Sequence, residues 1–586
     1  MSLPPSGPQL AVDTCGRRLR PLGGVGPSIG AEASISWYGP ARVPRSWPGS
    51  EAVVQAVTGL MEVNGRDRGR PRRFGIEVAS VAAGILAAHG AVAAAIGRRR
   101  GHRTTEVHTS VLQAGLLLLS NYFVVATALG DAIPGAALPA PGPPFRSADG
   151  TWFEIDTFDP DAWKAFWGGL GAAGPDLGRA WTVFQWRYER ATCSLPPGLH
   201  EASARHSLDE LRRVAAGTGI SLVAVRPYAD VLADGLESAA HPAVHPIRGP
   251  AAAPRSTQAT GGDDLPLAGI RVVEATSRIQ GPLAGMLLRM LGADVVRVQP
   301  PDGDYGRAAL CLHRQKETVA LDLAAPAGRA GLVELVADAD VFLHNWRPGK
   351  AAEWGLDVDD LTAGRPGLVY AHTSGWGDRA EAPRVMGTDF LVQAATAMGH
   401  GLHPEDEPPF PSRVVLCDLF GGLLGAEGVL AALYRREEEG GGWEVRSSLL
   451  AGAMALQAHV LDAMAADKEE GRREGRPVWG VLDRPIVTAD GTLVVTVEDD
   501  DAFRRLCQVC EVDPAGAPRA GTEERLAACL ATGPGAGWAE LLPRAGIPAA
   551  VVAEHVATVP ADPRVSDLFE PVGIGGLAPR SPWSFR

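Results

Sequence analysis

Asp418 is the residue whose type and surroundings could most directly do chemistry in this chain. It follows an apolar run over 414–417 and precedes a stretch of small residues that includes Gly421 and Gly422. The pattern predicts a strand over 414–417 and then a helix that ends near the glycines at 440–442. Asp418 would then lie at a helix N-terminus, where exposed N–H groups and the helix dipole favour an anion.

Two interpretations of Asp418 remain open at this point. An aspartate before a helix is commonly an N-cap, which closes the first turn and has no chemical role. An ionised carboxylate at an open, glycine-lined position could instead act as a nucleophile. In that case the backbone N–H groups that follow it are candidate oxyanion donors, namely those of Leu419, Gly421 and Gly422.

Composition narrows the class of protein. The chain has 586 residues, so we expect two or three domains. A 46% apolar share and a net charge of −13 favour a globular protein and argue against nucleic acid as the main partner. Of the seven cysteines, only Cys507 and Cys510 form a C-x-x-C pair, so we expect reduced thiols, no metal site and a cytoplasmic protein. The N-terminus has no basic segment followed by an apolar core, so no signal peptide is expected.

Two apolar runs, 78–96 and 112–129, are long enough to raise the question of a membrane. Alanine dominates the first, and Ser80 and His89 interrupt it; Gln113, Ser120 and Asn121 interrupt the second. We therefore predict buried helices of a large protein and no membrane association.

The chain also contains an internal repeat. Residues 49–115 align without a gap with residues 387–453, at an offset of 338 (418 − 80). The matches include four pairs: Gln55 with Gln393, Gly84 with Gly422, Glu106 with Glu444, and Ser110 with Ser448. Ser80 occupies the position that matches Asp418, so the first copy lacks the carboxylate.

The repeat divides the chain into four parts. Residues 1–33 are rich in Gly and Pro and are expected to be flexible, and 34–236 form a shortened, degenerate copy. A Pro/Ala/Gly-rich linker is expected over 237–264, and the second copy runs over 265–586. The second copy begins with strand–helix–strand alternation, which predicts an α/β unit with a parallel sheet. It carries neither G-x-G-x-x-G nor a P-loop, so neither NAD nor ATP is expected.

Six segments of the second copy, in order, resemble the family III CoA-transferases of the CaiB/BaiF type. They are PLAGIRVVEATS with GADVVRVQPPDGD, LDL at 321–323, NWRPG at 345–349, SGWG at 374–377, GTDFLVQA at 387–394, and CDLFGGLLGAEGVLAALYRRE from 417 onward. The resemblance implies a doubly wound, Rossmann-like large domain that binds CoA and a smaller α/β domain. It also implies a homodimer, or here an intramolecular pseudo-dimer in which the first copy takes part of a second subunit's place.

The resemblance assigns roles to residues. Asp418 matches the catalytic aspartate, which would carry CoA from an acyl-CoA to a carboxylic acid through an aspartyl-CoA thioester. Coenzyme A, as the substrate, would lie against three loops and needs neither a metal nor NAD. The residues implied in these loops are Ser277, Arg278, Ile279, Gln280, Ala284, Asn345, Trp346, Arg347, Ser374, Gly375 and Trp376.

Two alternatives follow from related proteins. The α-methylacyl-CoA racemases and isomerases of the same family place a histidine directly before the aspartate that matches Asp389, but here that residue is Thr388. A racemase would therefore lack its base. The chain could instead be a non-catalytic CoA-binding scaffold, because one copy has lost its carboxylate.

Overall fold

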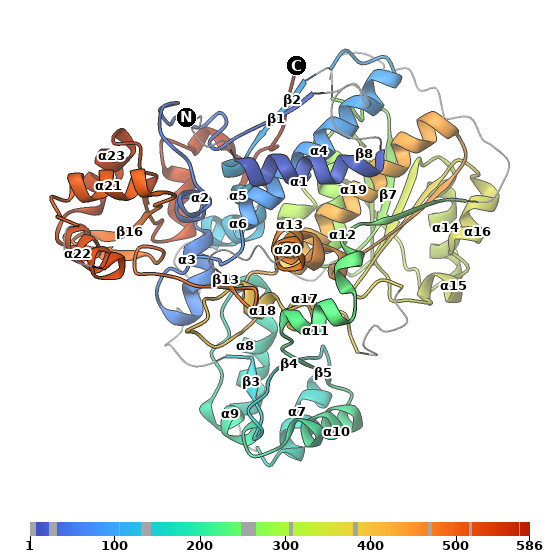
Figure 1. The fold of residues 1–586 in the computed structure, drawn as a ribbon. Helices are drawn as coiled ribbons and strands as arrows, with labels where there is room; N and C mark the ends of the chain where they lie inside the picture. The colour runs from blue at the N-terminus through green and yellow to red at the C-terminus, as the bar shows by residue number, and fades with distance from the viewer. Residues whose placement is uncertain are drawn as a thin grey trace.

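The computed structural model describes most of the chain. The described residues are 8–22, 32–104, 106–129, 142–172, 174, 176–247, 265–303, 309–378, 385–466, 472–514, 518–573 and 575–586. Figure 1 shows a central body of long helices flanked by a sheet domain and by two smaller lobes.

A seven-stranded sheet forms the large domain, in the order β6-β12-β11-β10-β7-β8-β9. All neighbours are parallel except β6 and β12. The strands are β6 (Ala243–Pro246), β7 (Arg271–Ala275), β8 (Asp294–Gln299), β9 (Glu317–Ala320), β10 (Val341–His344), β11 (Val369–Ser374) and β12 (Trp443–Ser448). Apart from β6, β7 is the first strand of this sheet along the chain and lies centrally. β10, β11 and β12 follow on one side of it and β8 and β9 on the other, which is the doubly wound order.

Helices cover both faces of this sheet. α12 (Gln280–Met290) and α19 (Leu416–Glu439) pack on one face, where Val272, Leu287 and Leu423 share a core. α14 (Pro326–Ala337) and α16 (Val358–Gly364) pack on the other, with Val273, Leu332 and Leu361. Because both faces are covered there, the central strands β7 and β10 are buried over almost their whole length. The expected doubly wound large domain is confirmed.

Two small lobes have the same plan, a three-stranded antiparallel sheet with helices. The lower lobe in Figure 1 holds β3 (Phe145–Arg146), β4 (Trp152–Asp156) and β5 (Ser221–Ala224) with α7 (Pro160–Gly169), α8 (Asp176–Arg190) and α10 (Leu208–Thr218). The red lobe holds β15 (Ile486–Thr488), β16 (Gly491–Val495) and β17 (Ala549–Val551) with α21 (Asp500–Val509), α22 (Arg519–Thr532) and α23 (Gly535–Arg544). Each lobe has its own apolar core.

Residues 338 apart have the same structural roles in the two halves. Ser80 is the third residue of α4 (Val78–Arg99), as Asp418 is of α19. Ser110 and Ser448 are the N-caps of α5 (Val111–Leu118) and α20 (Leu449–Ala465). β1 (Glu32–Ser36) pairs in parallel with β2 (Glu106–Ser110), as β11 pairs with β12. The first half thus keeps two strands that match the sheet of the second half.

The two halves interlock. The last strand, β20 (Ser584–Phe585), pairs with β2, and the Trp583 indole donates to the Leu86 carbonyl of α4 at 2.7 Å. The red lobe packs on α2 (Glu51–Val57), while β4 and β5 of the lower lobe pack on α17 (Asp389–Ala395). Each small lobe therefore covers a helix of the opposite half.

Three expectations about segments need correction. Within 1–33, expected to be flexible, residues 9–19 form α1 (Gln9–Leu19), because Ala11, Cys15 and Leu19 bury an apolar stripe against α4. Within the expected linker 237–264, residues 243–246 form the edge strand β6; residues 248–264 lie outside the described part. The expected strand over 414–417 is absent, because α19 already begins at Leu416.

The long apolar helices are buried. α4 and α19 are each long and apolar enough to cross a membrane by length and composition, and α5 with α6 (Ser120–Leu129) forms a bent apolar pair. The most apolar window of α4 is 100% buried inside the protein and that of α19 is 83% buried. Burial accounts for their apolar composition, as the alanine-rich sequence predicts.

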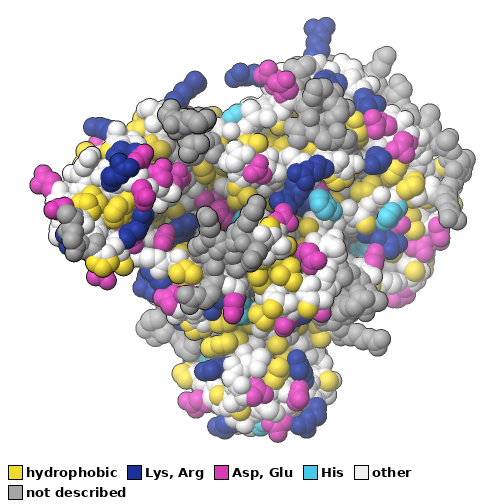
Figure 2. Space-filling view, viewed as in Figure 1, with side chains coloured by type: hydrophobic (Ala, Val, Ile, Leu, Met, Phe, Trp, Pro, Cys, Tyr) yellow, Lys and Arg dark blue, Asp and Glu magenta, His cyan; other side chains and the backbone are white. Residues whose placement is uncertain are grey.

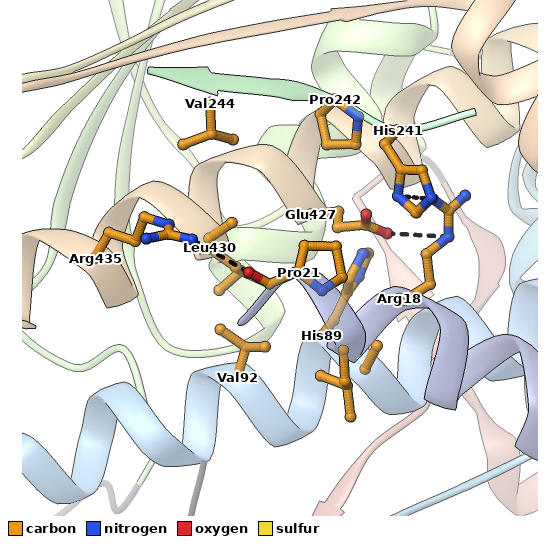
Figure 3. Close-up of a pocket in the computed structure, with 13 residues that line it drawn as sticks. Arg18, Pro21, His89, Val92, His241, Pro242, Val244, Glu427, Leu430 and Arg435 are labelled. Carbon is orange, nitrogen blue, oxygen red and sulfur yellow. Dashed lines mark hydrogen bonds and ion pairs between the residues drawn. The ribbon is translucent and has the colours of Figure 1, made fainter. Parts of the chain in front are cut away.

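A cavity of about 180 Å³ lies where α1, α4 and α19 meet (Figure 3). His89 and Glu427, which are 338 residues apart, both line it. Arg18 Nε lies 3.5 Å from Glu427 Oε2. Burial and the Arg18 charge lower the pKa of His89 to about 3, so this side chain is neutral. Glu427 is nine residues beyond Asp418, or about 13 Å along the helix. The cavity belongs to the contact between the two halves.

Candidate active site

Three predicted loops meet at the carboxyl edge of the parallel sheet. Strand order reverses between β7 and β10, and in sheets of this type ligands bind in the crevice at that point. The turn after β7 and the loop after β10 are joined there by a reciprocal pair: Ser277 N–H donates to the Asn345 side chain at 3.0 Å, and Asn345 Nδ2 donates back to the Ser277 carbonyl at 2.8 Å. Gln280 Nε2 donates to the Ser374 carbonyl after β11 at 3.2 Å.

The predicted binding residues divide into exposed and buried groups. Ser277, Arg278 and Arg347 are exposed, and Asn345, Trp346, Ser374 and Gly375 are half-buried, so all seven can reach a ligand. Ile279, Gln280, Ala284 and Trp376 are buried. Ala284 packs on α19, where a Cβ on Gly425 would lie 3.2 Å from the Ala284 Cβ. The assignment of Ala284 to the ligand is therefore wrong, since it supports the contact between α12 and α19.

The glycines after Asp418 serve the same helix contact. A Cβ on Gly421 would lie 3.0 Å from Gln280 Nε2, and one on Gly422 would lie 2.8 Å from the Gln280 carbonyl oxygen. These glycines let α19 approach α12 closely and so bring the Asp418 end of α19 to the β7 turn. The sequence suggested that these glycines leave an open face for the substrate, but helix α12 fills that space.

The expected oxyanion donors are also wrong. Asp418 is the third residue of α19 and not its cap, so the N–H groups that follow it lie inside the helix. Leu419 N–H already donates to the Val415 carbonyl at 3.0 Å. Gly421 and Gly422 lie in the second turn, where N–H groups bond to carbonyls four residues earlier. None of these three groups is available to a developing oxyanion.

Asp389 caps the start of α19 from another helix. One of its oxygens accepts the Asp418 N–H at 2.8 Å, and the Cys417 N–H also donates to this carboxyl group. Gln393, one turn later on α17, donates from its amide to the second oxygen at 2.5 Å. These bonds satisfy donors that the first turn of a helix leaves open. Asp389 is 1% exposed, so its role is to position the Asp418 backbone.

The environment of Asp418 raises its pKa. Burial raises the pKa of the Asp418 carboxyl group to about 7. The Arg278 charge and a hydrogen bond from the Gln280 N–H oppose the rise, while the Asp156 charge adds to it. Burial and the Asp418 charge raise the pKa of Asp389 well above its usual value.

The lower lobe, from the first half of the chain, forms one wall of the site. Asp156 at the end of β4 is fully buried, pairs with Arg187 at 3.1 Å, and accepts the Tyr188 hydroxyl. The Tyr188 ring lies 4.8 Å from the Phe390 ring, next to Asp389. The sequence motifs gave no signal for Asp156 or Tyr188, because both lie in the copy that lacks the carboxylate. Their location follows only from the interlocked fold.

The raised pKa predicts the pH dependence of any reaction in which Asp418 is the nucleophile. Only the carboxylate attacks, and a pKa of about 7 leaves it mostly protonated at pH 5.5. We expect kcat/KM to rise about tenfold per pH unit below pH 7 and to level off above about pH 8. Initial rates over pH 5.5–9, with far-UV CD at each pH, measure this. A flat profile between pH 5.5 and 8 would show that Asp418 keeps an ordinary pKa or is not the attacking group.

Comparison with known sequences identifies the family. The sequence model described as CoA-transferase family III matches residues 32–260 and again residues 267–568. The chain belongs to CoA-transferase family III. Both halves match the same model, in agreement with the structural roles that residues 338 apart share.

The individual relatives are matched over less than half of this chain. Succinyl-CoA:glutarate CoA-transferase of Mus musculus is 30% identical over 263 residues, which is 42% of this chain and 59% of the relative. Succinyl-CoA–D-citramalate CoA-transferase of Chloroflexus aurantiacus is 31% identical over 283 residues, 46% of this chain and 69% of the relative. The first four relatives are matched over 59–68% of their own length.

A solved structure is also similar. The crystal structure of a CAIB/BAIF family protein from Brucella suis is 25% identical and covers 54% of this chain and 92% of its own, with a TM-score of 0.47.

Proposed function

We propose that the chain transfers CoA from an acyl-CoA to a carboxylic acid, with Asp418 as the nucleophile. The observation that carries this proposal is the position of Asp418. Its carboxylate is held by the Gln280 N–H beside the crevice between β7 and β10, and its backbone is fixed by Asp389. Family membership and the relatives' names, which include succinyl-CoA, glutarate and D-citramalate, support the same reaction.

The reaction needs no net proton transfer. An Asp418 oxygen attacks the thioester carbonyl, the C–S bond breaks, and a mixed anhydride and the CoA thiolate form. The thiolate attacks the Asp418 carbonyl carbon, which releases the first acid as a carboxylate and leaves an aspartyl-CoA thioester. The second acid attacks this thioester and displaces the thiolate, which then takes the acyl group and restores the Asp418 carboxylate. The chain contributes orientation, a pre-formed site and exclusion of water.

The loops at the sheet edge provide a CoA site. Arg347 is an exposed cation on the loop after β10, suited to a phosphate. The Trp346 ring, 4.7 Å from His344 and 5.1 Å from Trp354, forms part of an aromatic cluster suited to adenine. We propose that Ser277, Gln280, Asn345, Trp346, Arg347, Ser374 and Gly375 hold CoA, with Ile279 and Trp376 supporting the loops from below.

We also propose that one chain forms the intramolecular pseudo-dimer. Two observations support this: each small lobe packs on a helix of the opposite half, and β20 of the second half pairs with β2 of the first. A cytoplasmic location is supported by seven free cysteines, six of them buried. Figure 2 shows Lys and Arg side chains interspersed with Asp and Glu on the face in view, which fits a small-molecule enzyme better than a polyanion-binding protein.

A trapped adduct tests the proposed function directly. After incubation with an accepted acyl-CoA, the protein should gain the mass of CoA less one water, and hydroxylamine should replace the CoA with a hydroxamate on Asp418. Intact-mass and peptide analysis measure both. A racemase would instead exchange the α-hydrogen of the acyl-CoA with deuterium from the solvent and form no adduct. A scaffold would bind CoA and do neither, so the three functions give three different results.

A further inference from the structure

Arg278 combines a strained backbone with a side chain anchored across the two halves. Its φ is +66°, a left-handed conformation that is strained for a non-glycine residue. This conformation follows β7 directly and aims the side chain at the lower lobe, where the guanidinium carbon lies 3.7 Å from the centre of the Phe158 ring. Strain of this kind persists where the surrounding structure requires it, and it is concentrated at functional sites.

The guanidinium makes no direct ion pair among the residues that the structure describes. No ion pair or hydrogen bond joins it to a carboxylate there, and its one close partner is the Phe158 ring, which is itself 38% exposed. Stacking on an aromatic face holds an arginine but leaves its N–H groups free to bind an anion. An exposed aromatic ring and a cation that contacts no carboxylate of the described residues together form a surface suited to a carboxylate.

The Arg278 charge also acts on the nucleophile, since it lowers the pKa of Asp418 against the effect of burial. During the proposed reaction Asp418 becomes a neutral CoA thioester, so Arg278 then loses the negative charge it faces. At that stage the site has a net positive charge from this pair, and that is when the second acid must bind. The cation is therefore most attractive to an anion at the step that selects the acceptor.

The Arg278 guanidinium is suited to a carboxylate of the substrate that does not take part in the reaction. The attacking carboxylate loses its negative charge as the anhydride forms, so an ion pair to that group would stabilise the ground state more than the transition state. An ion pair to a second, remote carboxylate is equally strong in both states and improves binding without slowing attack. The acceptor best suited to this arrangement has two carboxylates.

We propose that Arg278, stacked on Phe158 of the first half, binds the non-reacting carboxylate of a dicarboxylic acid. This inference rests on the proposed function and names its substrate class. It also gives the degenerate first half a role in selecting the acid, because Phe158 fixes the guanidinium from the lower lobe. Arg278, assigned to CoA from the sequence, then serves the acyl side of the site.

The test compares acids of equal length that differ in one carboxylate. With acetyl-CoA as donor at pH 9, where Asp418 is ionised, kcat/KM is measured for succinate against butyrate and for glutarate against valerate. The wild-type protein should prefer each dicarboxylate. Arg278→Gln should lower the ratio of dicarboxylate to monocarboxylate kcat/KM about 50-fold, through KM, and Arg278→Lys should restore part of it. Phe158→Leu should lower the ratio about 5-fold, because the charge remains but is less well fixed.

Two controls separate this inference from structural damage. Arg544→Gln removes an exposed arginine on α23 that pairs with Glu540, and it should leave the ratio unchanged. Arg278→Gly relieves the left-handed backbone and should not lower the melting temperature, yet it should lose the preference as Arg278→Gln does. Equal losses for both acids in Arg278→Gln, or no dicarboxylate preference in the wild type, would overturn the inference. If the adduct on Asp418 still forms from acetyl-CoA, the proposed function survives that result; if no adduct forms, the proposed function fails first.

Discussion

Replacing Asp418 by alanine is expected to lower kcat for CoA transfer on the order of 10⁴-fold or more, because removing the nucleophile of a covalent pathway has effects of that size. The backbone position of residue 418 depends on its N–H bond to Asp389, which alanine keeps. The fold should therefore persist, and the loss should be chemical. Initial rates with a competent pair of acids, the melting temperature and the affinity for CoA measure the three effects separately.

Ser80→Ala is the matched control. Ser80 occupies the same third position of α4, is 2% exposed, and donates its hydroxyl to Glu51 at 2.6 Å. Its loss should cost about 1 kcal/mol of stability and leave kcat unchanged. A rate loss in Ser80→Ala comparable to that in Asp418→Ala would locate chemistry in the first half. More than about 1% residual turnover in Asp418→Ala would show that the carboxylate only shapes the helix start.

The large domain and its loops could be predicted because local signals determine them. Apolar strands such as β7 and β10, each followed by a polar loop, place Ser277 and Asn345 at the same edge of a parallel sheet. The reciprocal hydrogen bonds between these two residues are the result. The parallel direction of β7 and β10 is enough to place both loops at the same edge of the sheet, whatever conformation each loop adopts.

The electrostatics of Asp418 could not be predicted, because distant parts of the chain set them. An unperturbed aspartate is ionised at neutral pH, but burial and the Asp156 charge of the lower lobe bring the pKa of Asp418 to about 7. Asp156 is 262 residues away in sequence (418 − 156). The start of α19 was misplaced for the same reason. Asp389, from α17, caps it, so the helix needed no cap residue of its own at 418.

Glu51 and Asp389 show what the first half has kept. Glu51 accepts the Ala79 and Ser80 N–H groups at 2.9 and 2.8 Å, and Gln55 donates to it at 3.0 Å. Asp389 has the same arrangement with Cys417, Asp418 and Gln393. Burial raises the pKa of Glu51, as it does that of Asp389. Both halves thus keep the carboxyl group that caps the helix, Glu51 in the first and Asp389 in the second. Only the second half has a carboxylate, Asp418, at the capped position, where the first half has Ser80.

Asp389→Ala and Glu51→Ala are therefore expected to cost similar stability and different activity. Each change leaves two buried N–H groups without their acceptor, which should lower the free energy of unfolding by about 3 kcal/mol, while the glutamine amides keep their bonds to backbone carbonyls. Urea unfolding followed by CD measures this, since each variant should lower the midpoint by a similar amount.

Only Asp389→Ala should also lower kcat, by about 100-fold, because the first turn of α19 moves and the Asp418 carboxylate leaves the Gln280 N–H. KM for the acyl-CoA should change little, since the Ser277–Asn345 loops do not depend on Asp389. Glu51→Ala, with an equal stability loss, should keep wild-type kcat at temperatures where it is folded. If both variants lost activity alike, the rate effect would come from destabilisation, and Asp389 would not position the nucleophile.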